Sequence, residues 1–250
     1  MEVHAHTHTA RKKWTHYFWE FLMLFLAVFC GFLAEYQLEH KIEKNRERQY
    51  MQSMVKDLVA DTAHLNEGFP RKEERITAID SLFEYFTVHR DKKTIPAYIH
   101  NLMRRSSWDR AYDRNNITMT QLKNAGNMRL VRKKNVADSI LNYDFCWERA
   151  DSYYKQAYWN NSGIVNEYIK KIISDYSLLP YYKANTTTAA RLEGEAAGIT
   201  IAINTTLLLE YLNHLHKLKI TIVQDKEFYR DIEKRAERLI DLIQKEYHLK

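Results

Sequence analysis

Glycine, proline and cysteine are scarce in this 250-residue chain, which holds 6 Gly, 3 Pro and 2 Cys. So few chain breakers argue against a sandwich or barrel built from many short strands, and they favour long helices. The two cysteines, Cys30 and Cys146, lie far apart in the sequence, so the chain has no disulfide framework and no CxxC zinc motif. We therefore expect an all-α protein that is stabilised mainly by helix packing.

Blocks of like charge are also absent, because 38 basic residues are interspersed with 32 acidic ones and no run of five like charges occurs. The net charge of +6 could suggest nucleic-acid binding. Interspersed charges are more typical of a solvated helical surface. No nucleic-acid partner is expected.

Catalytic signatures are missing as well. The chain contains no HExxH zinc motif, no GxSxG nucleophile motif and no Gly-rich phosphate loop. His4, His6 and His8 alternate in the N-terminal tail and could bind a transition metal weakly, although a flexible tail without a structural role is the simpler interpretation. We predict that the protein is not an enzyme and holds neither a metal nor a cofactor.

Residues 17–34 form a long apolar run with a single charged side chain, Glu20. As a helix rising about 1.5 Å per residue they would extend about 27 Å, close to the hydrocarbon thickness of about 30 Å. Trp14, Tyr17 and Tyr36 flank the run where aromatic belts form, and no small-residue cleavage site follows. The run is predicted to be a retained signal anchor, a transmembrane helix that contacts membrane lipid.

The predicted span has two unlike faces when its residues are placed at intervals of about 100°. One face is an aromatic stripe of Phe18, Phe21, Phe25, Phe29 and Phe32. Small residues gather on the other face, where the backbone of another helix can approach closely. We predict a helix-packing interface of Glu20, Ala27, Cys30, Gly31 and Ala34. Glu20 would either hydrogen-bond to a neighbouring helix or reach the headgroup region.

The domain organisation follows from where the apolar run ends. Residues 1–16 are an N-terminal tail, residues 17–34 the span, residues 35–50 a charged helical neck and residues 51–250 an extramembrane helical bundle. The helix is predicted to run on without a breaker through the neck, because Gly68 and Pro70 give the first stop signal. The expected fold is therefore one N-terminal transmembrane helix that continues into a long helix, followed by an antiparallel bundle.

Apolar spacing predicts further helices in the bundle. A second helix is expected from Ile76, a short third one after Pro96, and another that stops at Gly126. A long helix after Asn135 is expected to bury Leu141 and Phe145, among others. Residues 184–198 are the most loop-like interval.

An aromatic cluster covers residues 143–159. Trp147, Tyr154 and Trp159 could line a ligand pocket that stacks on a sugar or peptide, but aromatic residues at helical spacing belong to a core more often than to a binding site. Both interpretations are open at this point.

Three stretches of the sequence stand out together: the span, "RERQYMQSMVKDLVADTAHL" and "TQLKNAGNMRLVRKKNVADSILNYD". They resemble a family of single-pass bacterial membrane proteins of unknown function. The positions that carry the resemblance are Glu20, Gly31, Gln37, Glu47, Tyr50, Met51, Met54, Asp57, Leu58, Asp61, Leu122, Lys123, Gly126, Asn127, Arg129 and Leu130. The resemblance implies a bacterial inner-membrane protein with a helical extramembrane domain and implies no specific activity.

We expect a non-enzymatic scaffold that forms a homo-oligomer or joins a larger membrane complex. The alternative is an extracytoplasmic sensory or ligand-binding module. Arg11, Lys12 and Lys13 stand directly before the span and favour a cytoplasmic N-terminus, which would place the main domain in the periplasm.

Overall fold

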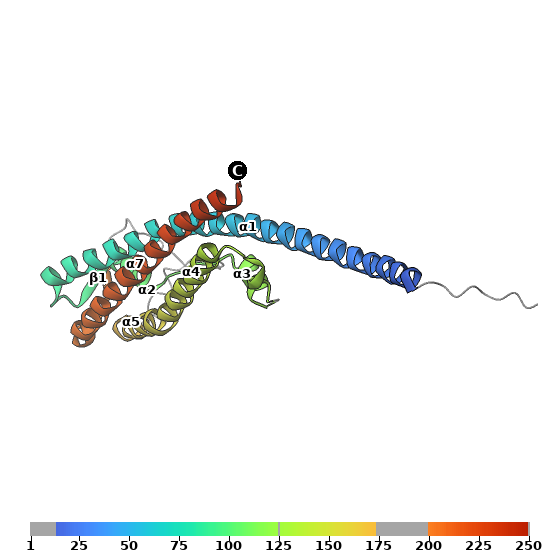
Figure 1. The fold of residues 1–250 in the computed structure, drawn as a ribbon. Coiled ribbons are helices and arrows are strands. Elements are labelled where there is room, and N and C mark those ends of the chain that lie inside the picture. The colour runs from blue at the N-terminus through green and yellow to red at the C-terminus, as the bar shows by residue number, and fades with distance from the viewer. Residues whose placement is uncertain (1–13, 125, 174–199, 250) are drawn as a thin grey trace, which may run out of the picture. The chain divides into compact units, whose positions relative to one another are not determined.

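The computed structural model describes residues 14–124, 126–173 and 200–249, and it confirms the all-α class: a long N-terminal helix is followed by a helical bundle (Figure 1). The chain divides into two compact units, Met1–Tyr50 and Met51–Lys250. The three tail histidines and the loop-like interval 184–198 lie outside the described residues.

Helix α1, Trp14–His89, contains Pro70 in its interior. The predicted stop at Gly68 and Pro70, and the separate helix after it, were therefore wrong. A proline removes only one backbone donor, and the buried positions on either side, such as Leu65 and Ile79, keep the same helical spacing through it. Packing on both sides of Pro70 sustains the helix where the local sequence alone predicts a break.

Helix α7, Leu208–Tyr247, runs antiparallel to the other long helices of the bundle (Figure 1). Lys72 of α1 pairs with Asp225 of α7, and Asp80 of α1 pairs with Lys219 of α7. Later positions of α1 therefore contact earlier positions of α7. The same order holds for α4, Lys134–Tyr153, where Asn142 contacts Arg235 and Trp147 contacts Tyr229. It also holds for α5, Trp159–Ile172, where Asn161 contacts Thr221 and Tyr168 contacts Glu210. These two helices are joined by a π-helical turn, η2, Tyr154–Tyr158. Because α7 is antiparallel to both, α1 and the α4–α5 pair run parallel to each other.

The parallel arrangement requires a crossing connection between α1 and α4. Strand β1, Thr94–Pro96, pairs antiparallel with β2, Thr200–Ala202, and leads into α2, Ala97–Ser107. Residues 108–116, which we call the strap, have no regular secondary structure and lead to α3, Ile117–Asn124. The short 3-10 helices η1, Asn127–Leu130, and η4, Thr205–Leu207, precede α4 and α7.

Gly126 ends α3 as the sequence predicts. Its φ of 64° is in the left-handed region, which glycine adopts without a steric cost, and the chain turns there into η1. Leu130 and Val131 are buried immediately after the turn.

Two side chains of α4 do not lie where the sequence predicts. Leu141 and Phe145 are 45% and 60% exposed. The helix buries Cys146 as predicted, but it buries Tyr143 and Trp147 in place of Leu141 and Phe145, because Tyr143 contacts α1 and Trp147 contacts α7. Apolar spacing identified α4 as amphipathic but assigned Leu141 and Phe145 to the wrong side.

Candidate functional site

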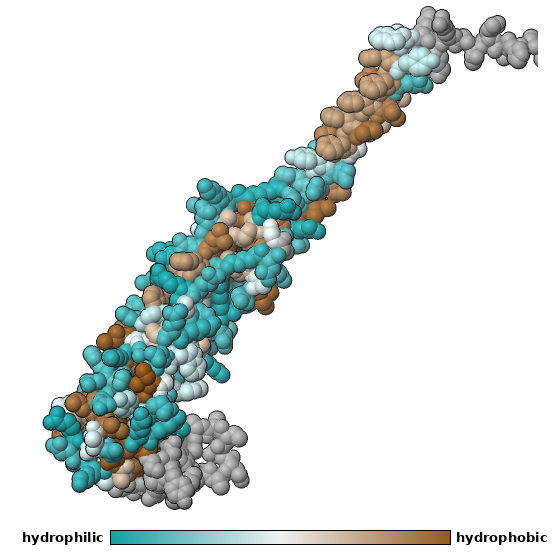
Figure 2. All heavy atoms as spheres, turned by 90° about the horizontal axis from the view of Figure 1, so that it is seen from below, coloured by the Kyte–Doolittle hydropathy of each residue, from teal (hydrophilic) through white to brown (hydrophobic). Residues whose placement is uncertain are grey.

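One described segment is long and apolar enough to cross a membrane, and it forms the N-terminal part of α1. None of its apolar window is buried within the chain, which distinguishes it from a core helix of a soluble domain. Figure 2 shows it as a continuous apolar band, whereas hydrophilic side chains cover much of the visible bundle surface.

The aromatic stripe of the span consists of rings that stack on one another. The ring centroids of Phe21 and Phe25 are 6.2 Å apart, and those of Phe25 and Phe29 are 5.9 Å apart. Among the small residues, a Cβ added at Gly31 would meet nothing within 4 Å. Ala27, Cys30, Gly31 and Ala34 are all exposed within the chain. Both faces of the span are exposed within the chain, so they differ in side-chain size: one carries large aromatic rings, and the other is shallow.

Glu20 has a polar neighbour on its own helix. His16 Nε2 lies 3.7 Å from Glu20 Oε1, and the two side chains are 50% and 58% exposed. The sequence analysis expected Glu20 to contact a neighbouring helix or the headgroup region, and it did not predict the contact with His16. The spacing of four residues places both side chains on one helix face, so the sequence did contain the signal.

Four charged side chains form a buried polar layer in the bundle: Lys72 and Arg75 of α1, Asp109 of the strap and Asp225 of α7. Lys72 Nζ donates hydrogen bonds to Asp225 Oδ2 at 2.5 Å and to Asp109 Oδ2 at 2.9 Å. Arg75 Nη1 lies 2.8 Å from the same Asp109 oxygen. The Lys72 and Asp225 side chains are only 1% and 0% exposed. Two positive and two negative charges are thus opposed inside the core.

Tyrosine rings enclose the Lys72 ammonium. Its Nζ lies 5.1 Å from the ring centroid of Tyr112 and 5.8 Å from those of Tyr154 and Tyr229, distances at which a ring attracts a cation. The π-helical turn η2 places Tyr154 and Tyr158 in a stack with centroids 4.8 Å apart. Burial raises the pKa of Tyr158 to about 12, so its hydroxyl is protonated at neutral pH.

The polar layer also connects to backbone groups. Arg75 Nη2 donates to the Ser106 carbonyl at 2.9 Å and to the Tyr158 hydroxyl at 2.8 Å. Burial raises the pKa of Asp225 above its ordinary value, although the charge and hydrogen bond of Lys72 act in the opposite direction. Removing any one of the four charges would leave the other three buried with unbalanced charge. The arrangement is suited to fixing the register of α1, the strap and α7.

Two aspartates of α1, Asp57 and Asp61, hold the end of the strap and the start of α3. The backbone N–H of Asn115 donates to Asp61 Oδ1 at 2.7 Å, and that of Thr118 donates to Asp57 Oδ2 at 2.9 Å. Tyr143 OH donates to the other Asp61 oxygen at 2.6 Å. Burial raises the pKa of Asp61, against the hydrogen bond from Tyr143. Two acidic positions that carry the resemblance therefore have a structural role in this fold.

A second ion-pair cluster holds the same end of the strap, through Arg114 next to Asn115. Arg114 Nη1 donates to Asp144 Oδ1 at 2.7 Å, and Lys123 pairs with the other Asp144 oxygen. Burial alone would raise the pKa of Asp144, but the hydrogen bonds and charges of Lys123 and Arg114 outweigh it and hold the pKa below its ordinary value of 3.8.

This lowered pKa gives the Asp144 cluster a defined pH dependence. A carboxylate whose pKa is lower in the folded state stabilises the fold above its unfolded pKa and loses that contribution as the pH falls through its folded pKa. The stability advantage of the wild type over Asp144→Asn should therefore be largest at neutral pH and shrink below pH 3.8. Urea denaturation of both proteins at several pH values measures this difference in the free energy of unfolding.

Asp61→Asn is the matched control, because the pKa of Asp61 is shifted in the opposite direction. The advantage of the wild type over Asp61→Asn should fall as the pH rises from 3.8 through the raised folded pKa. Equal pH trends for the two variants would contradict the assigned shifts.

The three aromatic residues of the predicted ligand pocket do not share one environment. Trp147 and Tyr154 are buried, at 4% and 3% exposure, whereas Trp159 is 61% exposed. The Trp147 ring packs on Tyr229, at a centroid distance of 5.5 Å, and the Tyr154 ring lies 6.4 Å from that of Trp159. Trp159 lines a surface hollow of about 400 Å³ that neither Trp147 nor Tyr154 lines.

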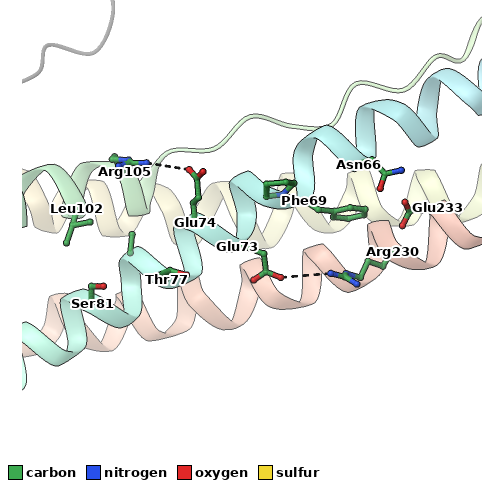
Figure 3. A pocket seen from close by; sticks show the side chains of 12 residues that line it. Asn66, Phe69, Glu73, Glu74, Thr77, Ser81, Leu102, Arg105, Arg230 and Glu233 are labelled. Carbon is green, nitrogen blue, oxygen red and sulfur yellow. Dashed lines mark hydrogen bonds and ion pairs between the residues drawn. The ribbon is translucent and has the colours of Figure 1, made fainter.

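A larger groove, of about 830 Å³, runs along α1 between α2 and α7 (Figure 3). Its basic side chains lie beside acidic ones: Arg105 is 3.5 Å from Glu74, and Arg230 is 4.0 Å from Glu73. The Arg230 guanidinium also lies over the Phe69 ring, 5.4 Å from its centroid. The groove is open, and its charges are mixed.

Among the described residues, no group of three or more His, Cys, Asp or Glu side chains is arranged to hold a metal ion. No family model matches the chain, and neither a curated protein nor a solved structure does.

Proposed function

We propose that this protein is a non-enzymatic membrane scaffold whose span associates with the span of a second copy or with a larger membrane complex. The two-sided span carries the proposal. Both faces are exposed within the chain, but one carries large phenylalanine rings, whereas the small residues on the other allow the backbone of a second helix to approach closely. The interface would comprise Glu20, Ala27, Cys30, Gly31 and Ala34.

The proposed location is the bacterial inner membrane, with the N-terminus in the cytoplasm and the bundle in the periplasm. The bacterial origin rests on the resemblance of the span and of the Asp57–Asp61 stretch to a bacterial family. The orientation rests on the basic cluster of residues 11–13.

Disulfide crosslinking in native membranes tests the association. Single cysteines at Ala27 and Ala34, in a Cys30→Ser background, should crosslink between copies about fivefold more than a cysteine at Phe25. Phe25→Cys is the control because it lies on the aromatic face, only two residues before Ala27. Equal crosslinking at the three positions, or none at any of them, would reject self-association through this face.

Gly31→Leu gives an independent measurement. A large side chain at the shallow face should prevent close approach and reduce the Ala27→Cys crosslink by about tenfold. Phe32→Leu, on the aromatic face, should leave the crosslink unchanged. If Gly31→Leu also leaves it unchanged and a larger complex still copurifies, the span does not associate through its small residues.

The alternative function, an extracytoplasmic sensory or ligand-binding module, has less support. Two of its three predicted aromatic residues are packed in the core, and the α1 groove pairs each of its arginines with a glutamate.

A further inference from the structure

The inner face of α1 repeats every three and four residues from Met51 to Phe86. The buried positions in this register are Met51, Met54, Leu58, Asp61, Leu65, Gly68, Lys72, Arg75, Ile79, Leu82 and Phe86. Apolar residues at such spacing form the seam of a coiled coil. An entirely apolar series of this length would suit pairing with the same helix of a second copy.

Polar residues interrupt the seam at Asp61, Lys72 and Arg75. Inside the bundle each of them is matched by a group from elsewhere in the chain. Asp61 accepts hydrogen bonds from Tyr143 and from the Asn115 backbone, and Lys72 and Arg75 oppose the two aspartates of the polar layer.

The same residues would be unmatched in a parallel pair of α1 helices. Each seam residue then lies against its own copy, so Lys72 would face Lys72, and Arg75 would face Arg75. Burying like charges without counter-charges is strongly unfavourable. Asp109 and Asp225 would also lose their partners, since both are contributed by other segments of the bundle.

We infer that the polar layer selects the intramolecular partner of α1: it keeps the seam inside its own bundle and excludes pairing with α1 of a second copy. The inference rests on the proposed function, because association of single-pass spans brings two α1 helices together in parallel and at high local concentration. The span is then the contact between copies, and the polar layer prevents the seam of α1 from forming a second contact between copies.

The test replaces residues of the polar layer in oppositely charged pairs, so that the buried charges are removed without leaving a net charge in the core. One variant exchanges a single pair, Lys72→Met with Asp225→Leu. A second variant adds Arg75→Leu and Asp109→Asn. Each is made in the full-length chain with Cys30→Ser and Cys146→Ala, and each carries one reporter cysteine, either Leu65→Cys on the seam or Val59→Cys on the exposed side of α1, where Val59 is 51% exposed.

The expected result is about tenfold more interchain disulfide at Leu65→Cys in the four-residue variant than in the parent, with an intermediate rise in the paired exchange and no rise at Val59→Cys. No increase at Leu65→Cys in either variant overturns the inference. Equal increases at both reporters also overturn it, because they indicate an unfolded chain that has no seam preference. Ala27→Cys, measured in the same set, decides the proposed function separately: its crosslink reports only on the span.

Discussion

Lys72→Ala is expected to lower the free energy of unfolding of the bundle by about 3–5 kcal/mol. The substitution leaves Asp225 and Asp109 buried, with no lysine between them, in a layer where Asp225 is fully enclosed. The tyrosine rings around the ammonium lose their cation as well. Urea denaturation of the solubilised protein, followed by circular dichroism and extrapolated to water, measures the effect.

Two further variants separate charge from volume. Lys72→Met keeps most of the side-chain stem, so it should be nearly as destabilising as Lys72→Ala if the lost charge dominates. Lys170→Ala removes an exposed ion pair with Glu167, N to O at 2.9 Å, and should cost less than about 1 kcal/mol. If Lys72→Met costs no more than Lys170→Ala, the buried charges do not hold the layer together.

Gly68→Ala is expected to destabilise the bundle by about 1–3 kcal/mol. A Cβ at this position would lie 2.0 Å from Cε1 of Tyr112, far inside van der Waals contact. The ring has little room to move, because its centroid is 4.3 Å from that of Tyr229 and 6.0 Å from that of Phe69. Thermal or urea unfolding gives the change in stability.

Gly163→Ala provides the matched control on another helix. Gly163 lies within α5, and a Cβ added there meets nothing within 4 Å. Alanine should therefore stabilise the bundle by up to about 1 kcal/mol, since it restricts the unfolded chain and favours helix. Changes of the same sign at both glycines would show that the strap does not pack against α1 at Gly68.

Local and periodic signals predicted most of the fold. The span needs only a run of apolar residues, and the end of α3 needs only one glycine that adopts a left-handed conformation at Gly126. Both features are determined by residues that are close together in the sequence, so they can be predicted from a single sequence. The exposed positions Leu141 and Phe145 were misassigned, because the side of α4 that is buried depends on where α1 and α7 lie.

The polar layer was missed for a related reason. Lys72 and Arg75 look like ordinary surface residues until the seam spacing is continued through them from Leu65 to Ile79. That continuation was a usable signal. The stop signals at Gly68 and Pro70 hid it, because they suggested two helices with unrelated faces. Asp109 had no signal of its own, since the strap has no regular periodicity.

The aromatic cluster shows how far helical spacing can distinguish a core from a pocket. Tyr154 follows Trp147 by seven residues, so the two side chains share one face of a regular helix, and both are buried. Trp159 follows Tyr154 by five residues, which at about 100° per residue places it about 140° away from Tyr154, and it is exposed. Spacing therefore separates Trp159 from the other two residues, but it does not tell which face of the helix is buried.

The pairing of Lys72 with Asp225 also determines when the bundle can form during synthesis. The two residues are 153 positions apart, so the ribosome produces the lysine long before its counter-ion. Contacts of such long sequence separation form late and slow the overall reaction. Asp109 is the only one of the two counter-charges that the N-terminal half supplies, so the polar layer is complete only after α7 has been translated.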